Sequence, residues 1–278
     1  MEHPFPATDA FMSIEQLIIL ALIQGITEFL PISSSGHLNL LHELTDWADQ
    51  GVLMDVAVHA GTLVAVVAYF RQEVWRLILG GLALLKGEVT SDGRLALYIV
   101  LATIPAVVVG YALLQSGAID ALRTAEIVAW GNLIFAGLLW WADKTGATDK
   151  KMDDMTWGQA LAIGVAQMLA LIPGASRSGS TITMARWLGY ERQDAARFSM
   201  LLSIPVILGA GLASTLKVVE AGNIELGTDM VIAAVLSCVT AFGAIALFMK
   251  MLESMSMMPF VIYRVVLGLG LLVWVYWS

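Results

Sequence analysis

Cysteine and charged residues are scarce in this chain of 278 amino acids. The single cysteine, Cys238, excludes an intramolecular disulfide and leaves the redox compartment undefined. Charged residues make up 14% of the chain, and 15 Lys and Arg against 23 Asp and Glu give a net charge of −8. Because nucleic-acid binding needs a basic surface that neutralises phosphates, we expect no nucleic-acid partner.

Hydrophobic residues, in contrast, account for 58% of the chain, and the mean hydropathy is +0.79. This hydrophobic share is well above that of soluble domains. The N-terminal stretch MEHPFPATDA is acidic and has no Lys or Arg, so we expect no cleaved signal peptide. The composition predicts an all-α polytopic membrane protein, with residues 1–278 forming a single integral membrane domain.

Five apolar runs are long enough to cross about 30 Å of hydrocarbon as helices. They lie near residues 95–114, 125–143, 195–215, 230–250 and 258–277. A sixth run at 53–70 is shorter and carries Asp55 and His59 near its start, which a helix tolerates when both side chains face protein or water. The sequence therefore predicts six transmembrane helices.

Two further segments, at about 12–48 and 157–190, each contain two short apolar pieces separated by a polar stretch. The polar stretches are PISSSGH at 31–37 and PGASRSGST at 173–181. Neither piece is long enough to span, and irregular backbone at membrane depth must be satisfied by protein or water. We therefore predict two re-entrant helix-loop-helix hairpins, each followed by three spans.

The two halves, about 12–143 and 157–277, are predicted to form an inverted-topology repeat. Gln24 precedes Ser35 by the same interval as Gln167 precedes Ser178. With three spans in each half, the second hairpin enters from the opposite side, and the two tips meet near the midplane.

Loop charges agree with this topology, since basic residues gather in three loops that the positive-inside rule assigns to the cytoplasm. These residues are Arg71, Arg76, Lys86, Arg94, Lys144, Lys150, Lys151, Arg186, Arg192 and Arg197. The opposite loops hold Arg123, and Lys217 among several carboxylates. We expect both termini on that opposite face.

The first hairpin carries a set of groups that suits acyl or phosphoryl transfer. Gln24 and Glu28 share one helix face near the tip, and a carboxylate in an apolar helix must be paired, protonated or bound to a cation. A structural hydrogen bond within the hairpin is the alternative. The tip then supplies candidate nucleophiles and a general base, although a helix N-cap would equally explain one serine. These residues are Ser33, Ser34, Ser35 and His37.

The second tip is predicted to bind an anion. Arg177 can hold phosphate oxygens in bidentate fashion, and Ser176, Ser178 and Thr181 add hydroxyls at the start of a helix. The alternative is a structural ion pair between Arg177 and Glu28. Outside the tips, Arg264 belongs either to the site or to the interface, where it would snorkel.

The segments QGITEFLPISSSGH at 24–37 and PGASRSGST at 173–181 resemble the undecaprenyl pyrophosphate phosphatase family, also called the bacitracin-resistance family. The resemblance includes MDVAVHAGTLVAVVAYF and PFVIYRVVLG, so it covers nearly the whole chain. It implies hydrolysis of C55 prenyl pyrophosphate to undecaprenyl phosphate and inorganic phosphate, which recycles the carrier lipid of cell-wall synthesis. It also implies the bacterial inner membrane, with a pocket open to the periplasm.

The resemblance further implies a divalent cation, Mg²⁺ or Ca²⁺. Gln24 stands where the family has Glu or Gln, so Glu28 is the main acidic group and both residues are the expected metal ligands. We expect Ser34 to be the nucleophile and His37 its base, while attack by His37 or by activated water stays open. The expected pyrophosphate contacts are Arg177, Ser33, Ser35, Ser176, Ser178 and Thr181. For the assembly, a homodimer is one option.

Two other functions fit parts of this pattern. Inverted repeats with broken helices are typical of secondary transporters, so a transporter or flippase of a phosphorylated lipid is the alternative. A type-2 acid phosphatase would need a second histidine after its Ser-Arg pair, and no histidine follows His59.

Overall fold

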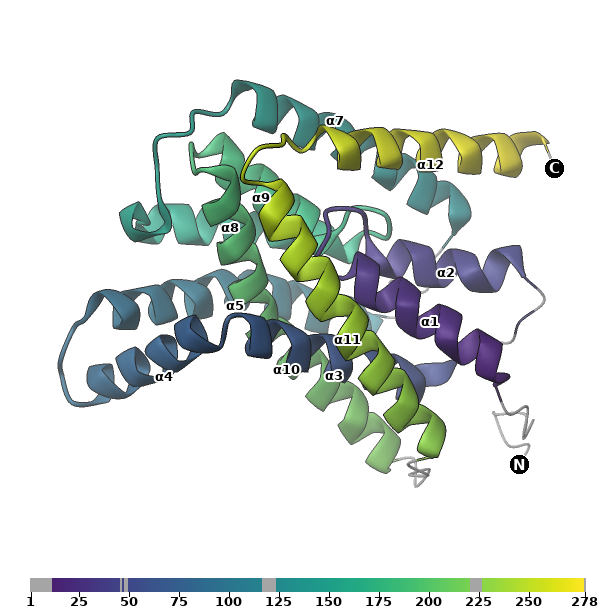
Figure 1. Cartoon of the computed structure of the whole chain (residues 1–278), viewed down its shortest axis with the longest axis horizontal. Coiled ribbons are helices and arrows are strands. Elements are labelled where there is room, and N and C mark those ends of the chain that lie inside the picture. The colour runs from purple at the N-terminus through teal and green to yellow at the C-terminus, as the bar shows by residue number, and fades with distance from the viewer. Residues whose placement is uncertain (1–11, 46, 48–49, 117–123, 221–226, 278) are drawn as a thin grey trace.

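The computed structural model describes residues 12–45, 47, 50–116, 124–220 and 227–277, and these segments fold almost entirely into helices. Within them, six helices are long and apolar enough to cross a membrane, as predicted. They are α3 (Gly51–Tyr69), α5 (Ser91–Ser116), α7 (Ala125–Thr145), α10 (Arg192–Glu220), α11 (Thr228–Met251) and α12 (Met258–Trp277). Figure 1 shows them as a bundle of crossing helices.

Two pairs of shorter helices form the predicted hairpins. The first pair is α1 (Ile14–Thr27) and α2 (Ser34–Leu44), and the second is α8 (Trp157–Met168) and α9 (Arg177–Trp187), with the 3₁₀ turn η2 (Leu169–Leu171) after α8. In Figure 1 the α1–α2 pair enters the bundle from the side where α12 ends, and the α8–α9 pair enters from the opposite side. Their turns meet inside the bundle.

The packing of the hairpins follows the repeat. Helix α1 packs on α11, and α8 packs on α5, which holds the equivalent place in the other half. Gly25 and Gly164 make these crossings close, because a Cβ at either position would overlap the backbone of the partner helix. Both tips also share a rare conformation, with φ of 73° at Ser33 and 72° at Ser176. These equivalences agree with an inverted repeat.

A helix occupies part of the segment predicted as the first basic loop. Residues Arg71–Leu85 form α4, which turns back on the start of α5 through Gly80 and Gly93. The Arg76 Nη2 atom lies 2.8 Å from Asp92 Oδ1, joining the two helices. The loop prediction is wrong here, because the apolar run between the charges is too short to span but forms a helix that packs on α5.

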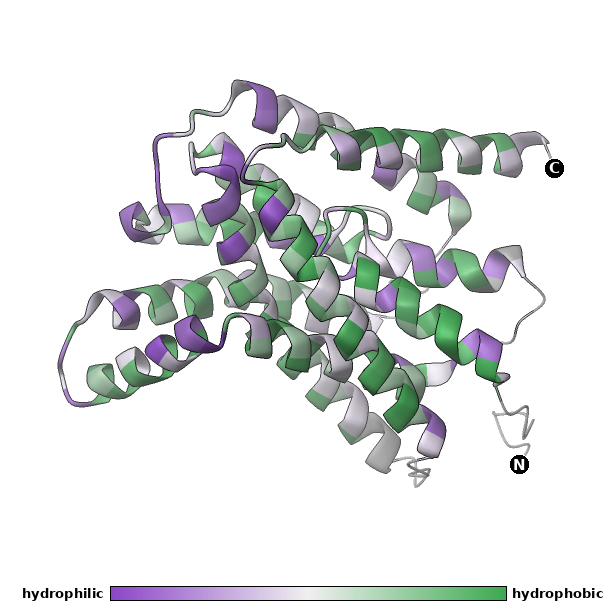
Figure 2. Cartoon of the chain, in the orientation of Figure 1, coloured by the Kyte–Doolittle hydropathy of each residue, from purple (hydrophilic) through white to green (hydrophobic). Residues whose placement is uncertain are grey.

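The charged end of the bundle comprises α4 and the turns at 86–90, 146–156, 188–191 and 252–257. Polar residues gather there, whereas the spans are largely hydrophobic (Figure 2). Large apolar side chains such as Val64, Val108, Val239 and Val266 are more than half exposed, as expected for helix faces in contact with lipid. The core beneath them includes Phe29, Val66, Leu139, Ile163, Phe198 and Phe248.

An ion-pair cluster around Asp143 holds the charged end together. Arg186 Nε and Arg192 Nε donate to Asp143 Oδ1 over 3.0 and 2.7 Å, and the backbone N–H of Met257 donates to Oδ2 over 3.0 Å. Arg186 is fully buried, so its assignment as a loop charge was wrong. Nearby, burial raises the pKa of Tyr190 to about 12, and its hydroxyl donates to Gln159.

Candidate active site

Glu28, at the C-terminal end of α1, is the centre of a polar network that joins the two hairpin tips. Gln24 Nε2 and Ser34 Oγ donate to Glu28 Oε2 over 3.0 and 2.7 Å, and Arg177 Nη2 donates to Oε1 over 3.2 Å. His59 Nε2, from α3, lies 3.8 Å from Oε2. The carboxylate is 8% exposed, so this buried charge is paired as membrane burial requires.

Arg177 begins α9 and connects the second tip to the first. Besides Glu28, its guanidinium donates to the carbonyl oxygen of Ser199 over 3.1 Å and lies 5.9 Å from the Phe29 ring centroid. The ion pair that the sequence left as an alternative is therefore present. The Arg177 side chain is 13% exposed.

The serines at the start of the two tip helices act as N-caps. Ser33 Oγ accepts from Gly36 N–H over 3.3 Å, and Ser176 Oγ accepts from Gly179 N–H over 3.0 Å. The capping alternative thus holds for Ser33. Ser35 is exposed, and its Oγ lies 3.4 Å from that of Ser33.

Two more predicted substrate contacts are buried and hydrogen-bonded within the protein. Ser178 Oγ donates to the carbonyl of Leu30 over 2.7 Å, which ties the two tips together. Thr181 Oγ1 lies 2.9 Å from the Arg177 carbonyl and 2.7 Å from Ser199 Oγ. These bonds position the second tip, and direct contact of either hydroxyl with a substrate stays a prediction.

His37 lies one turn into α2, but it does not bond to Ser34. Its Nδ1 is 2.7 Å from the Ser33 carbonyl oxygen, and its Nε2 is 2.6 Å from the hydroxyl of Tyr263 on α12. Ser34 donates to Glu28 instead. In this arrangement the group placed to accept the Ser34 proton is Glu28, whereas sequence reasoning had assigned that task to His37.

Arg264, next to Tyr263, is fully buried, so it belongs to the site region and not to the interface. Its guanidinium donates to the carbonyls of Pro31, Gly174 and Ala175 over 3.0, 2.8 and 3.0 Å, which lie in the turns of both hairpins. The sequence signal for Arg264 was a charged residue within an apolar span. Tyr263 gave no such signal.

The residues at the hairpin tips supply some, but not all, of the oxygen ligands that a divalent cation needs. Gln24 Oε1 is buried and has no hydrogen-bond partner, and it belongs to the side chain that donates to Glu28. Carboxylate and amide oxygens are ligands that Mg²⁺ and Ca²⁺ prefer. No cluster of three or more His, Cys, Asp or Glu converges in the described part of the chain, so substrate oxygens and water would complete the coordination.

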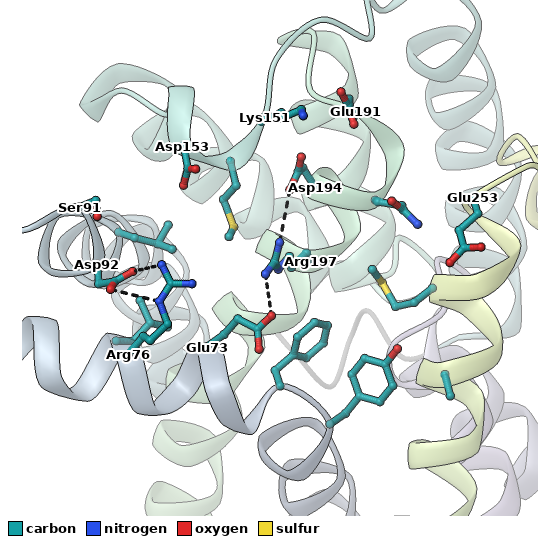
Figure 3. A pocket seen from close by; sticks show the side chains of 18 of the residues that line it. Glu73, Arg76, Ser91, Asp92, Lys151, Asp153, Glu191, Asp194, Arg197 and Glu253 are labelled. Atoms are coloured by element: carbon teal, nitrogen blue, oxygen red, sulfur yellow. Dashed lines mark hydrogen bonds and ion pairs between the residues drawn. The ribbon is translucent and has the colours of Figure 1, made fainter.

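A cavity of about 710 Å³ opens elsewhere, at the charged end between α4, α5, α10 and α11 (Figure 3). Glu73 and Arg197 pair across it over 2.6 Å. Arg76 and Asp92 form a second pair at its edge. None of the predicted site residues lines this cavity, so it is distinct from the hairpin tips.

Six spans and two opposed re-entrant hairpins define a multi-pass integral membrane protein, and a carboxylate, a guanidinium, hydroxyls and an imidazole lie at the hairpin tips. The model of the family described as bacitracin resistance protein BacA matches residues 17–270, and this chain belongs to that family.

Curated relatives match over nearly their full length and are named undecaprenyl-diphosphatase. The protein from Maricaulis maris is 49% identical over 94% of this chain and 99% of its own. Those from Jannaschia sp. and Ruegeria pomeroyi are 48% and 50% identical, over 95% and 94% of this chain and 100% and 98% of theirs.

Proposed function

We propose that this protein hydrolyses undecaprenyl pyrophosphate to undecaprenyl phosphate and inorganic phosphate, and so recycles the carrier lipid of cell-wall synthesis. The observation that carries the proposal is the contact of Arg177 with Glu28, which brings an anion-binding group beside Ser34. Family membership and the name of the relatives support the same reaction.

Arg177 is the proposed binding group for the pyrophosphate. Its planar guanidinium can hold two phosphate oxygens at once, and the first turns of α2 and α9 add backbone N–H groups and the positive ends of two helix dipoles. Charge neutralisation of this kind provides most of the catalysis in phosphoryl transfer. The bound pyrophosphate would replace Glu28 as the partner of Arg177.

Ser34 is the proposed nucleophile. Its Oγ would bond to the terminal phosphorus while the bond from that phosphorus to the bridging oxygen breaks, which releases undecaprenyl phosphate. The Ser34 proton would pass to Glu28, its hydrogen-bond partner. Water would then hydrolyse the phosphoserine. Attack by His37, or by water that His37 and Glu28 activate, is the competing route, and a trapped phosphoenzyme separates them.

A divalent cation, Mg²⁺ or Ca²⁺, is proposed to bind Glu28 and Gln24. When bound, it would neutralise charge on the phosphoryl oxygens. The free acceptor atom Gln24 Oε1 supports this assignment.

The proposed location is the bacterial inner membrane, with the site open to the periplasm. The first hairpin enters from the face opposite the charged end, and the positive-inside rule places the charged end in the cytoplasm. Ser35 is exposed on that hairpin, and Ser34 and His37 are half-buried. These exposures support entry of the substrate from the outer side.

The test is phosphate release from C55 prenyl pyrophosphate by the detergent-purified protein, with and without EDTA. We expect EDTA to abolish release and Arg177→Ala to lower kcat/KM by about 100-fold or more, because a bidentate charge-assisted contact is lost. Arg76→Ala, which removes an exposed arginine at the charged end, is the matched control and should stay near wild type.

A lipid transporter would give the opposite result in this assay. Its activity requires a sealed membrane, so it would release no phosphate in detergent. Absence of release from folded wild-type protein would therefore move the assignment to the transporter.

A further inference from the structure

The hydrogen bonds of His37 define which ring nitrogen is available. Its Nδ1 lies 2.7 Å from the Ser33 carbonyl oxygen, which can only accept a hydrogen bond. Nδ1 therefore carries a proton, and in the neutral ring the lone pair is on Nε2. Any reaction that uses neutral His37 as base or nucleophile must use Nε2.

Tyr263 covers this nitrogen. Its hydroxyl lies 2.6 Å from His37 Nε2, and because Nε2 holds the lone pair, the phenol donates the hydrogen bond. The two rings are nearly parallel, with an interplanar angle of 13° and centroids 5.7 Å apart. The Tyr263 side chain is 43% exposed, so it lies on the accessible side of the imidazole.

The backbone next to Tyr263 is fixed against both hairpins. Arg264 is fully buried and donates to carbonyls in the turns at Pro31 and at Gly174 and Ala175. A sideways movement of this part of α12 would leave a buried guanidinium without partners, which is costly. The phenol can therefore rotate about its own side-chain bonds while its attachment point stays in place.

We propose that Tyr263 orients the His37 ring and covers Nε2 until the substrate arrives, and that it then donates its hydrogen bond to the substrate. An oxygen of the incoming pyrophosphate accepts the Tyr263 hydrogen bond in place of Nε2. The phenol keeps its proton, and the lone pair of Nε2 becomes free for chemistry. This role in the catalytic cycle rests on the proposed phosphatase function, in the route that uses His37, whereas the covering of Nε2 does not.

The experiment compares Tyr263→Phe with Tyr276→Phe. The control lies 13 residues beyond Tyr263 on the same helix, and it removes a hydroxyl that donates to Glu126 Oε1 over 2.5 Å. The probe is diethyl pyrocarbonate, which reacts with an unprotonated imidazole nitrogen, and mass spectrometry of the digested protein gives the rate at His37. The ring of Tyr263→Phe preserves the stacking, and a melting temperature confirms folding.

We expect the modification rate of His37 to rise about threefold to tenfold in Tyr263→Phe, as for the loss of one hydrogen bond of ordinary net strength. In Tyr276→Phe it should stay at the wild-type value. An unchanged rate in folded Tyr263→Phe would overturn the proposal.

Phosphate release then tests the catalytic part. We expect kcat/KM of Tyr263→Phe to fall by about tenfold, because the hydroxyl that orients His37 in the free enzyme and then donates to the pyrophosphate is lost. A wild-type kcat/KM in Tyr263→Phe would contradict this role. Wild-type protein that releases no phosphate would refute the phosphatase assignment alone, since the modification rate does not depend on turnover.

Discussion

At the scale of single residues, the polar groups inside apolar sequence were the reliable signals. Glu28, Arg177 and Ser34 stand out in the sequence because charges and hydroxyl clusters are expensive in a membrane, and in the structure Ser34 and Arg177 both bond to the Glu28 carboxylate. Tyr263 and Ser199 were missed, since a tyrosine or serine in an apolar span is unremarkable until its neighbour is known. Their contacts with His37 and Arg177 come from other helices.

Ser34 and Ser35 provide a test of the nucleophile. Ser34→Ala should lower phosphate release by at least about 100-fold, because the nucleophile and its bond to Glu28 are both lost. Ser35→Ala, on the exposed side of the same turn, should lower it by less than about tenfold, because an expected pyrophosphate contact loses one hydrogen bond while the nucleophile stays. The measurement is kcat in detergent.

A second measurement separates the chemical routes. A phosphoenzyme trapped from the wild type should carry the phosphoryl group on Ser34. If the label persists in Ser34→Ala and maps to His37, the serine route is wrong and the histidine is the nucleophile.

At the scale of elements, the spans and hairpins were predictable from the sequence, but the ion pairs that hold them together were not. The length of an apolar run fixes whether a helix can span, so the six spans followed from the sequence. Helix α4 did not, because the nine-residue apolar run between Arg76 and Lys86 is too short to predict a span. Arg186 was misassigned for a related reason, since only the fold shows that Asp143 neutralises it.

The Asp143 cluster should be important for stability. Asp143→Ala would leave Arg186 buried without its carboxylate, and we expect a loss of about 3–5 kcal/mol. Asp92→Ala, which breaks the more exposed pair with Arg76, should cost less than about 1 kcal/mol. Thermal unfolding in detergent measures both. Equal melting temperatures of the two variants would show that the Asp143 cluster stabilises the protein no more than the Arg76–Asp92 pair does.

At the scale of the whole molecule, the inverted arrangement gives the two hairpins opposite entrances. The topology predicts that α11 runs from the periplasm at Thr228 to the cytoplasm at Ser254, just after the helix. Both residues are exposed, so each accepts a cysteine at little cost. The natural Cys238 is first replaced by serine.

Labelling of intact cells with a membrane-impermeant maleimide then tests the orientation. Thr228→Cys should be labelled in intact cells, whereas Ser254→Cys should be labelled only after permeabilisation. The reverse pattern would invert the molecule and place the charged end outside.

The sequence by itself determined the membrane class, the six spans, the two interrupted hairpins and the residue types at their tips. These features depend on local composition and on the length of apolar runs, which a single chain displays directly. Tertiary structure alone decided that Ser34 faces Glu28, that Tyr263 covers His37 and that Arg264 holds both turns. Each of these is a contact between atoms brought together by helix packing, and its distance in space has no counterpart in sequence spacing.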